Sequence, residues 1–476
     1  MSTFTQGRQV ADCIEQQAVV ESKEVESKGV ESKGVESRSV ESEAVDQATY
    51  EDILGRRDQA SERLGFDPRG GERRRVGLEH TGLGCVGEST TPVRLLIVSD
   101  TEPYRNGVGA YYADLMADIE PLLSAVDICC PSTASLDLAS SWPWSRGISF
   151  PMPGDTTQRV RLPHVPTLTR HIHKFRPDVI VSATPGGYGI MAAHIGRQLG
   201  VKVFAGFHTC FTQIARLYWR RWRCLGARGL SLACHHVLFS MADEVLVNSP
   251  DMMRLAREHG ARRVRLVGTP VTPKYLSTPV RRLPTSVEKV LFVGRLAAEK
   301  NIEAVVRAAI SLPHMQFSFV GDGPERRKLE RISRSLPNVR LHGWVDRSAM
   351  DRVLDDHDVL VLPSRIESFG TVALEAMARQ RLVIVSPACG ITEWPCLRGG
   401  LRVMDPQETL TEALIDVSRL NAFGLFSQGA LARAAVRQHV LWNRRLWSTA
   451  LVEPVQAWSR SAVWRACARD MLTGWL

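Results

Sequence analysis

The chain has 476 residues, which is long enough for two or three domains. Its 44% hydrophobic and 23% charged residues are typical of a globular protein, and no apolar run approaches the ~18 residues of a membrane-spanning helix. The formal charge is +9, and because residues 1–50 hold ten acids and five bases (−5), residues 51–476 carry +14. Such a basic body favours anionic partners such as phosphorylated ligands, an anionic membrane surface or nucleic acid.

The cysteines indicate a reducing compartment. All ten are scattered without a CxxC pair, which is typical of free thiols in a cytosolic enzyme. Cys234-His235-His236 has no second ligand pair at zinc-site spacing, so we expect no metal there. The first residues lack the charged-then-apolar order of a signal peptide. We therefore expect a cytoplasmic protein, with peripheral contact to the inner membrane face left open.

The N-terminal residues 1–92 contain a pentapeptide repeat, VESKEVESKGVESKGVESRSVESEAV, at positions 20–45. A valine every fifth residue rotates by ~140° per repeat on a helix, so no apolar face forms, and an odd period alternates faces on a strand. We predict that residues 1–92 are a disordered tail that ends in a polar linker.

Strands and helices alternate from Val93 onward. Short apolar runs followed by helical patterns predict a parallel sheet covered on both faces. We expect a first domain over 93–272, a proline-rich linker within 270–285, a second domain over 286–440, and C-terminal helices over 441–476. The predicted strands are VRLLIVSD, DVIVSA (178–183), KVFAGFH (202–208), DEVLVNS (243–249), RVRLVGT (263–269), KVLFVGR (289–295), QFSFVGDG (316–323), NVRLHGW (338–344), VLVLPS (359–364) and LVIVSP (382–387).

The fold class is therefore α/β, with two doubly wound, Rossmann-like domains and a cleft between them. Ligands in such sheets bind beyond the carboxyl ends of the strands. Arg295 ends one strand and Lys300 opens the next helix, a pair that can neutralise a diphosphate or can simply be a solvated pair of cations. The VGDGPE turn places Gly321 at a neighbouring strand end.

Two glutamates stand eight positions apart in SRIESFGTVALEAMA, after a third strand of this domain. Glu367 lies just outside the expected helix start and can hold a sugar hydroxyl, and Glu375 lies inside the helix and can accept ribose hydroxyls. The amides of Phe369, Gly370 and Thr371 can bind phosphate between them. The alternative is an acid-decorated helix start that only complements the macrodipole.

The first domain offers a glycine loop and a histidine at its strand ends. Gly107 and Gly109 in NGVGAYYADL allow the backbone to approach an anion closely. The loop begins like a dinucleotide fingerprint, but the third glycine is missing and Asp127 is the only acid near the ribose position. His208 ends the strand KVFAGFH, where it faces either the cleft or the core.

The ordered set NGVGAYYADL, GFHTCF, ADEVLVNS, LFVGRLAAEKNI, FVGDGPERRKLE, LHGW and PSRIESFGTVALEAMA resembles the retaining glycosyltransferases of GT-B fold, family 4 type (group 1). The resemblance spans roughly residues 93–440. It implies that Arg295 and Lys300 bind the diphosphate, that Glu375 binds the ribose and that Glu367 contacts the donor sugar. It also implies that Gly107 closes over the donor phosphate and that His208 lies near the donor sugar. The C-terminal helices over 441–476 would, by the same resemblance, pack back on the first domain.

The chain departs from the family pattern at four places. The segment ARQRLVIVSP lacks the glycine and proline that usually precede the next strand, ACGITEW replaces a glycine-rich turn, and GTPVTPKYL replaces a glycine–valine–aspartate hinge. Asn106 stands where many relatives have the first glycine of the loop. These departures bear on the substrate more than on the fold or reaction.

The resemblance implies transfer of a hexose, such as mannose or glucose, from a UDP- or GDP-linked donor to an acceptor hydroxyl with retention of configuration. No nucleophile is evident, so we expect front-side displacement, and no DxD-type cluster is evident, so we expect neither a metal nor another cofactor. ARLYWRRWRCLGARGL (215–230) mixes aromatic residues with five arginines, which suits an anionic membrane surface and a lipid or glycan acceptor, or else a helix with an aromatic core face. No motif supports nucleic-acid binding. A GT-B nucleotide-sugar epimerase and a non-catalytic nucleotide-sugar-binding subunit remain as alternatives.

Overall fold

The structure is a computed structural model that describes residues 91–104, 106–131, 149–152, 155–209, 213 and 221–452. Side chains are described in these ranges except at 91–92, 149–152, 155–160 and 221–228. All of these residues belong to one unit, Cys85–Leu476. The predicted disordered tail up to residue 90 and the predicted terminal helix beyond residue 452 lie outside the described residues.

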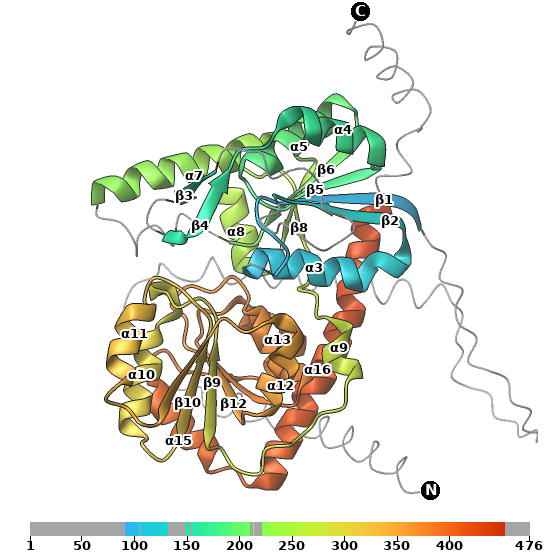
Figure 1. Cartoon of the computed structure of the whole chain (residues 1–476). Helices are drawn as coiled ribbons and strands as arrows, with labels where there is room; N and C mark the ends of the chain where they lie inside the picture. The colour runs from blue at the N-terminus through green and yellow to red at the C-terminus, as the bar shows by residue number, and fades with distance from the viewer. Residues whose placement is uncertain are drawn as a thin grey trace, which may run out of the picture. The chain divides into compact units, whose positions relative to one another are not determined.

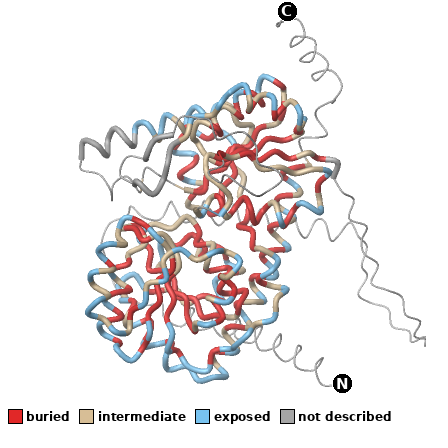
Figure 2. Tube along the Cα trace, in the orientation of Figure 1, coloured by how far each residue is buried: buried red, intermediate tan, exposed pale blue. Residues whose placement is uncertain are grey.

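The first half is a six-stranded parallel sheet in the order β2-β1-β5-β6-β7-β8 (Figure 1). The apolar runs of its central strands β1, β5, β6 and β7 are buried on both faces, as a parallel sheet covered by helices requires (Figure 2). Apart from the sheet, two strands form an antiparallel hairpin, β3 (Ser149–Met152) with β4 (Asp155–Arg161). The sheet strands are β1 (Thr91–Val98), β2 (Leu123–Cys129), β5 (Val179–Ser182), β6 (Lys202–Phe207), β7 (Glu244–Val247) and β8 (Val264–Leu266), and the helices are α3 (Gly107–Ile119), α4 (Val165–Phe175), α5 (Gly187–Gln198), α7 (Arg221–Met241) and α8 (Pro250–Glu258).

The second half repeats the architecture, with strand order β11-β10-β9-β12-β13-β14. The prediction of two doubly wound α/β halves is thereby confirmed. The strands are β9 (Lys289–Val293), β10 (Gln316–Val320), β11 (Val339–Gly343), β12 (Val359–Leu362), β13 (Leu382–Val385) and β14 (Arg402–Val403), and the helices are α10 (Ile302–Ser311), α11 (Arg326–Ser333), α12 (Met350–Asp355), α13 (Thr371–Ala378), α14 (Pro395–Arg398), α15 (Leu410–Ser418) and α16 (Ala422–Val452).

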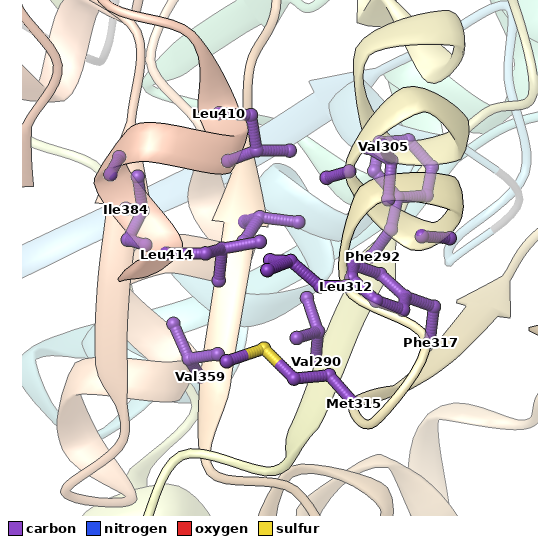
Figure 3. Packing of buried hydrophobic residues seen from close by; sticks show 14 of the residues in the cluster. Val290, Phe292, Val305, Leu312, Met315, Phe317, Val359, Ile384, Leu410 and Leu414 are labelled. Carbon is purple, nitrogen blue, oxygen red and sulfur yellow. The ribbon is translucent and has the colours of Figure 1, made fainter. Parts of the chain in front are cut away.

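Alternation along the central strands divides the second half into two core layers. Val290 and Phe292 of β9 pack in a cluster with α10 and α15 (Figure 3). Leu291, between them, packs in the opposite cluster with α12, α13 and α16. Successive side chains of a strand point to opposite faces, so a continuous apolar run serves both core layers.

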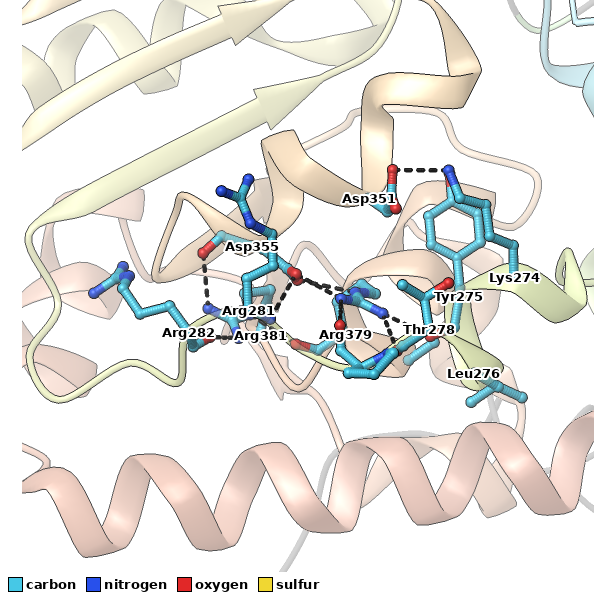
Figure 4. A network of polar contacts seen from close by, with 12 residues as sticks. Lys274, Tyr275, Leu276, Thr278, Arg281, Arg282, Asp351, Asp355, Arg379 and Arg381 are labelled. Carbon is cyan, nitrogen blue, oxygen red and sulfur yellow. Dashed lines mark hydrogen bonds and ion pairs between the residues drawn. The ribbon is translucent and has the colours of Figure 1, made fainter.

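The linker between the halves is more ordered than its prolines predict. A short helix, α9 (Pro273–Ser277), carries the buried Tyr275 into the second core. The buried guanidinium of Arg379 donates to the carbonyl oxygens of Thr278 (2.6 Å) and Pro279 (2.8 Å) and to Asp355 (Figure 4). The segment that departs from the family pattern, ARQRLVIVSP, therefore supplies the anchor for the linker. Backbone bonds to a charged donor are strong.

Helix α16 runs unbroken through residues 440 and 441, where the predicted domain boundary lies. Val436 and Val440 pack in the second core, and Trp447, Ala450 and Leu451 pack with strand residues of the first sheet. One helix therefore belongs to both halves.

Candidate functional site

Helix α3 begins where the sequence predicts an anion-binding loop. The side chain of Asn106 accepts a hydrogen bond from the amide of Gly109 at 2.9 Å and caps the helix. Asn is a favoured N-cap residue because its oxygen replaces a missing backbone acceptor. A Cβ at Gly109 would lie 2.1 Å from the carbonyl oxygen of Glu102, whereas a Cβ at Gly107 would meet nothing within 4 Å. The fold itself demands the second glycine, but not the first.

In the second half, Glu299 joins the predicted cations to the predicted carboxylate loop. Its side chain accepts from Arg295 at 3.1 Å, and its carbonyl oxygen accepts from the amide of Arg365 at 2.7 Å. Lys300, next in sequence, forms an ion pair with Glu367. The structure thus gathers Arg295, Lys300 and Glu367 at the carboxyl ends of β9 and β12.

The lysine of this cluster stays charged. Burial alone would lower the pKa of Lys300, but the charge and hydrogen bond of Glu367, with Glu299 behind, outweigh burial and raise it. Glu367 is further held by a backbone bond from Gly390 to its carbonyl oxygen at 3.0 Å. A fixed cation at a strand end is suited to a multiply charged anion such as a diphosphate.

The start of α13 has the backbone geometry that a phosphate site needs. Gly370 has φ +98°, a left-handed conformation that favours glycine. The amides of Thr371 and Val372, the first two of the helix, have no partner within it, whereas Ala373 already donates to the carbonyl oxygen of Gly370 at 2.8 Å. The Phe369 side chain is 1% exposed and packs against Trp394, so it serves the core, and only its backbone can reach a ligand.

Gly321 brings two strand ends together. Its φ is +132°, its amide donates to the carbonyl of Gly343 at 2.7 Å, and a Cβ there would lie 2.0 Å from the carbonyl oxygen of Gly294. The glycine is required for this close approach, which places the turn beside Arg295.

The structure pairs Glu375 with an arginine that the sequence analysis did not single out. Glu375 is 2% exposed and forms an ion pair with Arg347 at 2.8 Å. Arg347 also pairs with Asp114 of α3, which accepts a bond from Thr272 at 2.6 Å. Burial raises the pKa of Asp114 to about 6, with Arg347 opposing this shift and Glu375 adding to it.

Sequence reasoning missed Arg347, Asp114 and Tyr112. Arg347 follows the end of β11 as Arg295 follows the end of β9. This position after a parallel strand is the feature of the sequence that could have marked Arg347 as a candidate site residue. Asp114 and Tyr112 lie inside a helical pattern, where side chains are most often core or solvated, and nothing local marks them.

His208 is enclosed in the first half. It is 7% exposed, its Nε2 lies 2.9 Å from the Tyr112 hydroxyl, and the Tyr111 ring stacks on it at 4.2 Å between centroids. Burial lowers the pKa of His208 to about 3, so the imidazole is neutral near pH 7. A neutral ring donates one hydrogen bond through its protonated nitrogen and accepts one through the other nitrogen, and it carries no charge.

The predicted membrane segment is mostly outside the described residues. Positions 214–220 and the side chains of 221–228 are not described. Of the remainder, Leu230 on α7 is 68% exposed. Among the described residues, no helix is both long and apolar enough to cross a membrane.

Two family models match this chain. Residues 106–272 match the glycosyl transferase 4-like domain, and residues 287–419 match the glycosyl transferases group 1 model. Among curated proteins, the chain is 28% identical over 257 residues to the sulfoquinovosyl transferase SQD2 of Arabidopsis thaliana, a match that covers 52% of this chain and 49% of that protein. The chain therefore spans about half the length of that relative.

Two solved structures resemble the fold. Sucrose-phosphate synthase from Thermosynechococcus elongatus superposes with a TM-score of 0.56 at 19% identity, covering 75% of this chain and 99% of that chain. HepE from Anabaena, in complex with UDP and glucose, gives a TM-score of 0.55 at 15% identity with the same coverage.

Proposed function

Because this chain belongs to the group 1 glycosyltransferases of GT-B fold, we propose that it transfers a hexosyl group from a nucleoside-diphosphate sugar to an acceptor hydroxyl with retention of configuration. The observation that carries the proposal is the cluster of Arg295, Lys300 and Glu367, joined by Glu299 at the carboxyl ends of two strands. The UDP and glucose in HepE, a protein of similar fold, support a uridine donor as the first candidate. A guanosine donor, the alternative expected from the sequence, is the second.

In the proposed mechanism, the acceptor oxygen forms its bond to the anomeric carbon on the face from which the diphosphate leaves. The bond from that carbon to the β-phosphate oxygen breaks, and the acceptor proton passes to the departing phosphate. Arg295, Lys300 and the first-turn amides of α13 stabilise the charge that develops there. His208 is neutral, so it serves as a polar contact to the sugar instead of a charged acid.

We assign Glu367 to the donor sugar, Glu375 to the ribose, and Gly107 to the loop that approaches the donor phosphate. Glu375 would then release or share its contact with Arg347 when the nucleotide binds. A lipid or glycan acceptor at an anionic membrane surface, reached through residues 215–230, is the acceptor class we propose. The exposed Leu230 at the end of that segment supports it.

The first test is thermal unfolding of the full chain with UDP, GDP, UDP-glucose and GDP-mannose in the presence of a chelator. A ligand at a hundredfold excess over its Kd stabilises the folded state by ~2.7 kcal/mol. We expect one base to be selected in wild type and the shift to be lost in Arg295→Ala.

No shift with any nucleotide in a folded sample would remove the donor site from consideration. Nucleotide binding without turnover of any acceptor would instead favour a non-catalytic subunit, and release of an altered free sugar without acceptor consumption would favour an epimerase.

A further inference from the structure

Tyr112 of α3 reaches the imidazole of His208 through a gap left by Gly206. A Cβ at position 206 would lie 2.0 Å from the Tyr112 hydroxyl oxygen and 3.1 Å from His208 Nε2. Any larger residue at 206 would therefore displace the phenol. Gly206 lies within β6, where a glycine is unfavourable unless another group must approach closely.

The contact is fully enclosed. Tyr112 has no exposed surface, and Tyr111 covers one face of the His208 ring at an interplanar angle of 30°. Burial raises the pKa of the Tyr112 phenol well above its ordinary value, so the phenol keeps its proton. Two neutral groups thus share one hydrogen bond of 2.9 Å, and either could donate.

The protons can be arranged in two ways. In the first arrangement Nε2 carries the proton and donates to the Tyr112 oxygen. The Tyr112 hydroxyl proton then needs another acceptor, and the described residues supply none. The unprotonated Nδ1 also lacks a donor among these residues. If Tyr112 donates to Nε2, only Nδ1–H lacks a partner among the described residues. A buried polar group without a hydrogen bond is costly, so the second arrangement is favoured.

We propose that Tyr112 is a positioning residue that holds His208 as the Nδ1–H tautomer, so that the ring offers a neutral hydrogen-bond donor to an oxygen of the donor sugar. This inference rests on the proposed function, because it takes the sugar as the partner of Nδ1–H. A phenylalanine would fill the same space in the core, so this role explains why the residue carries a hydroxyl group.

The tautomer is measured by ¹⁵N NMR on full-length protein with ¹⁵N-labelled histidines. The signals of His208 are assigned as those that disappear from the spectrum of His208→Gln. We expect Nδ1 to be protonated and Nε2 to be unprotonated in wild type. Tyr112→Phe should shift the population toward Nε2–H, because the phenol no longer donates. Tyr111→Phe is the matched control, since it keeps the stacked ring and does not touch the Nε2 bond, and it should leave the tautomer unchanged.

The binding readout compares a bare nucleoside diphosphate with its sugar-bearing form. Tyr112→Phe should bind the diphosphate like wild type and should lose about tenfold in affinity for the nucleotide sugar, the scale of one hydrogen bond. Wild-type Nε2–H, or the same tautomer in Tyr112→Phe and wild type, would overturn the inference. If wild type binds no nucleotide at all, the proposed function fails, while the NMR result still decides the tautomer.

Discussion

Arg347 Nη2 lies 2.8 Å from a carboxylate oxygen of Glu375 and also pairs with Asp114 of α3, so one guanidinium holds two buried carboxylates from different halves of the chain. The rings of Tyr104 and Tyr275 lie 5.4 Å and 5.8 Å from its central carbon. Because Glu375 is the proposed ribose ligand, this arginine links donor binding to the first half.

Replacing Arg347 should destabilise the protein strongly. Arg347→Met leaves two buried carboxylates without their cation, and removal of one partner from a buried ion pair typically costs about 3–5 kcal/mol. Chemical denaturation measures the loss. Arg307→Met is the control, because Arg307 is in an exposed pair with Glu303 on α10, and it should change stability by less than about 0.5 kcal/mol. Equal effects in the two variants would contradict the interpretation.

Asp114 should give the stability a recognisable pH dependence. Its pKa is about 6 when folded against 3.8 for an exposed aspartate, so between these values the folded state holds a proton that the unfolded state has lost. Unfolding free energy therefore falls as pH rises from 4 to 6, by roughly 2–3 kcal/mol. Asp114→Asn should lack this pH-dependent part of the unfolding free energy. The difference in unfolding free energy between wild type and Asp114→Asn should therefore decline from pH 4 to pH 6. A difference that is flat from pH 4 to 6 would show that Asp114 titrates normally.

Substitutions at the two loop glycines should have different effects, one on donor binding and the other on stability. Gly107→Ala should leave the melting temperature near that of wild type, since its Cβ meets nothing within 4 Å, yet it should weaken donor binding if the backbone approaches the phosphate. Gly109→Ala should lower stability by about 1–3 kcal/mol because of the contact with the Glu102 carbonyl. Thermal unfolding with and without nucleotide measures both effects. A Gly107→Ala variant that binds and turns over donor normally would remove Gly107 from the site.

Lys300 should matter to catalysis far more than Lys289, a lysine of β9 in the same half of the chain. Lys300→Met removes a charge proposed to stabilise the leaving diphosphate, and kcat/KM should fall by about 10²–10³. Lys289→Met, at the amino end of β9 and exposed, is the matched loss of one positive charge and should retain wild-type activity. Steady-state kinetics over donor concentration compares them. Similar losses in both would indicate a general effect of net charge.

The apolar runs predicted ten strands of the two sheets, because most of these strands are buried on both faces and therefore form nearly continuous apolar segments in the sequence. The strand LSAVDIC, β2, escaped prediction because only its two ends are buried. The predicted domain boundary at residue 440 falls inside helix α16, which is continuous. The buried residues of this helix pack in the second core up to Val440 and in the first core from Trp447 onward.

The site residues Arg295, Lys300, Glu367 and Gly321 could be predicted because each follows the end of an apolar strand in the sequence. Parallel strands bring their carboxyl ends to one edge of the sheet, so these residues were expected to lie close together. The amino-acid sequence by itself therefore determined two doubly wound halves and a cluster of charged residues at the edge of the second sheet. Only the tertiary structure decided that Arg347 joins Asp114, 233 positions away, to Glu375, and that Tyr112 meets His208 across the space above Gly206. Local propensity and periodicity report on neighbours within a few residues, whereas these contacts depend on how separate elements pack, which no local pattern encodes.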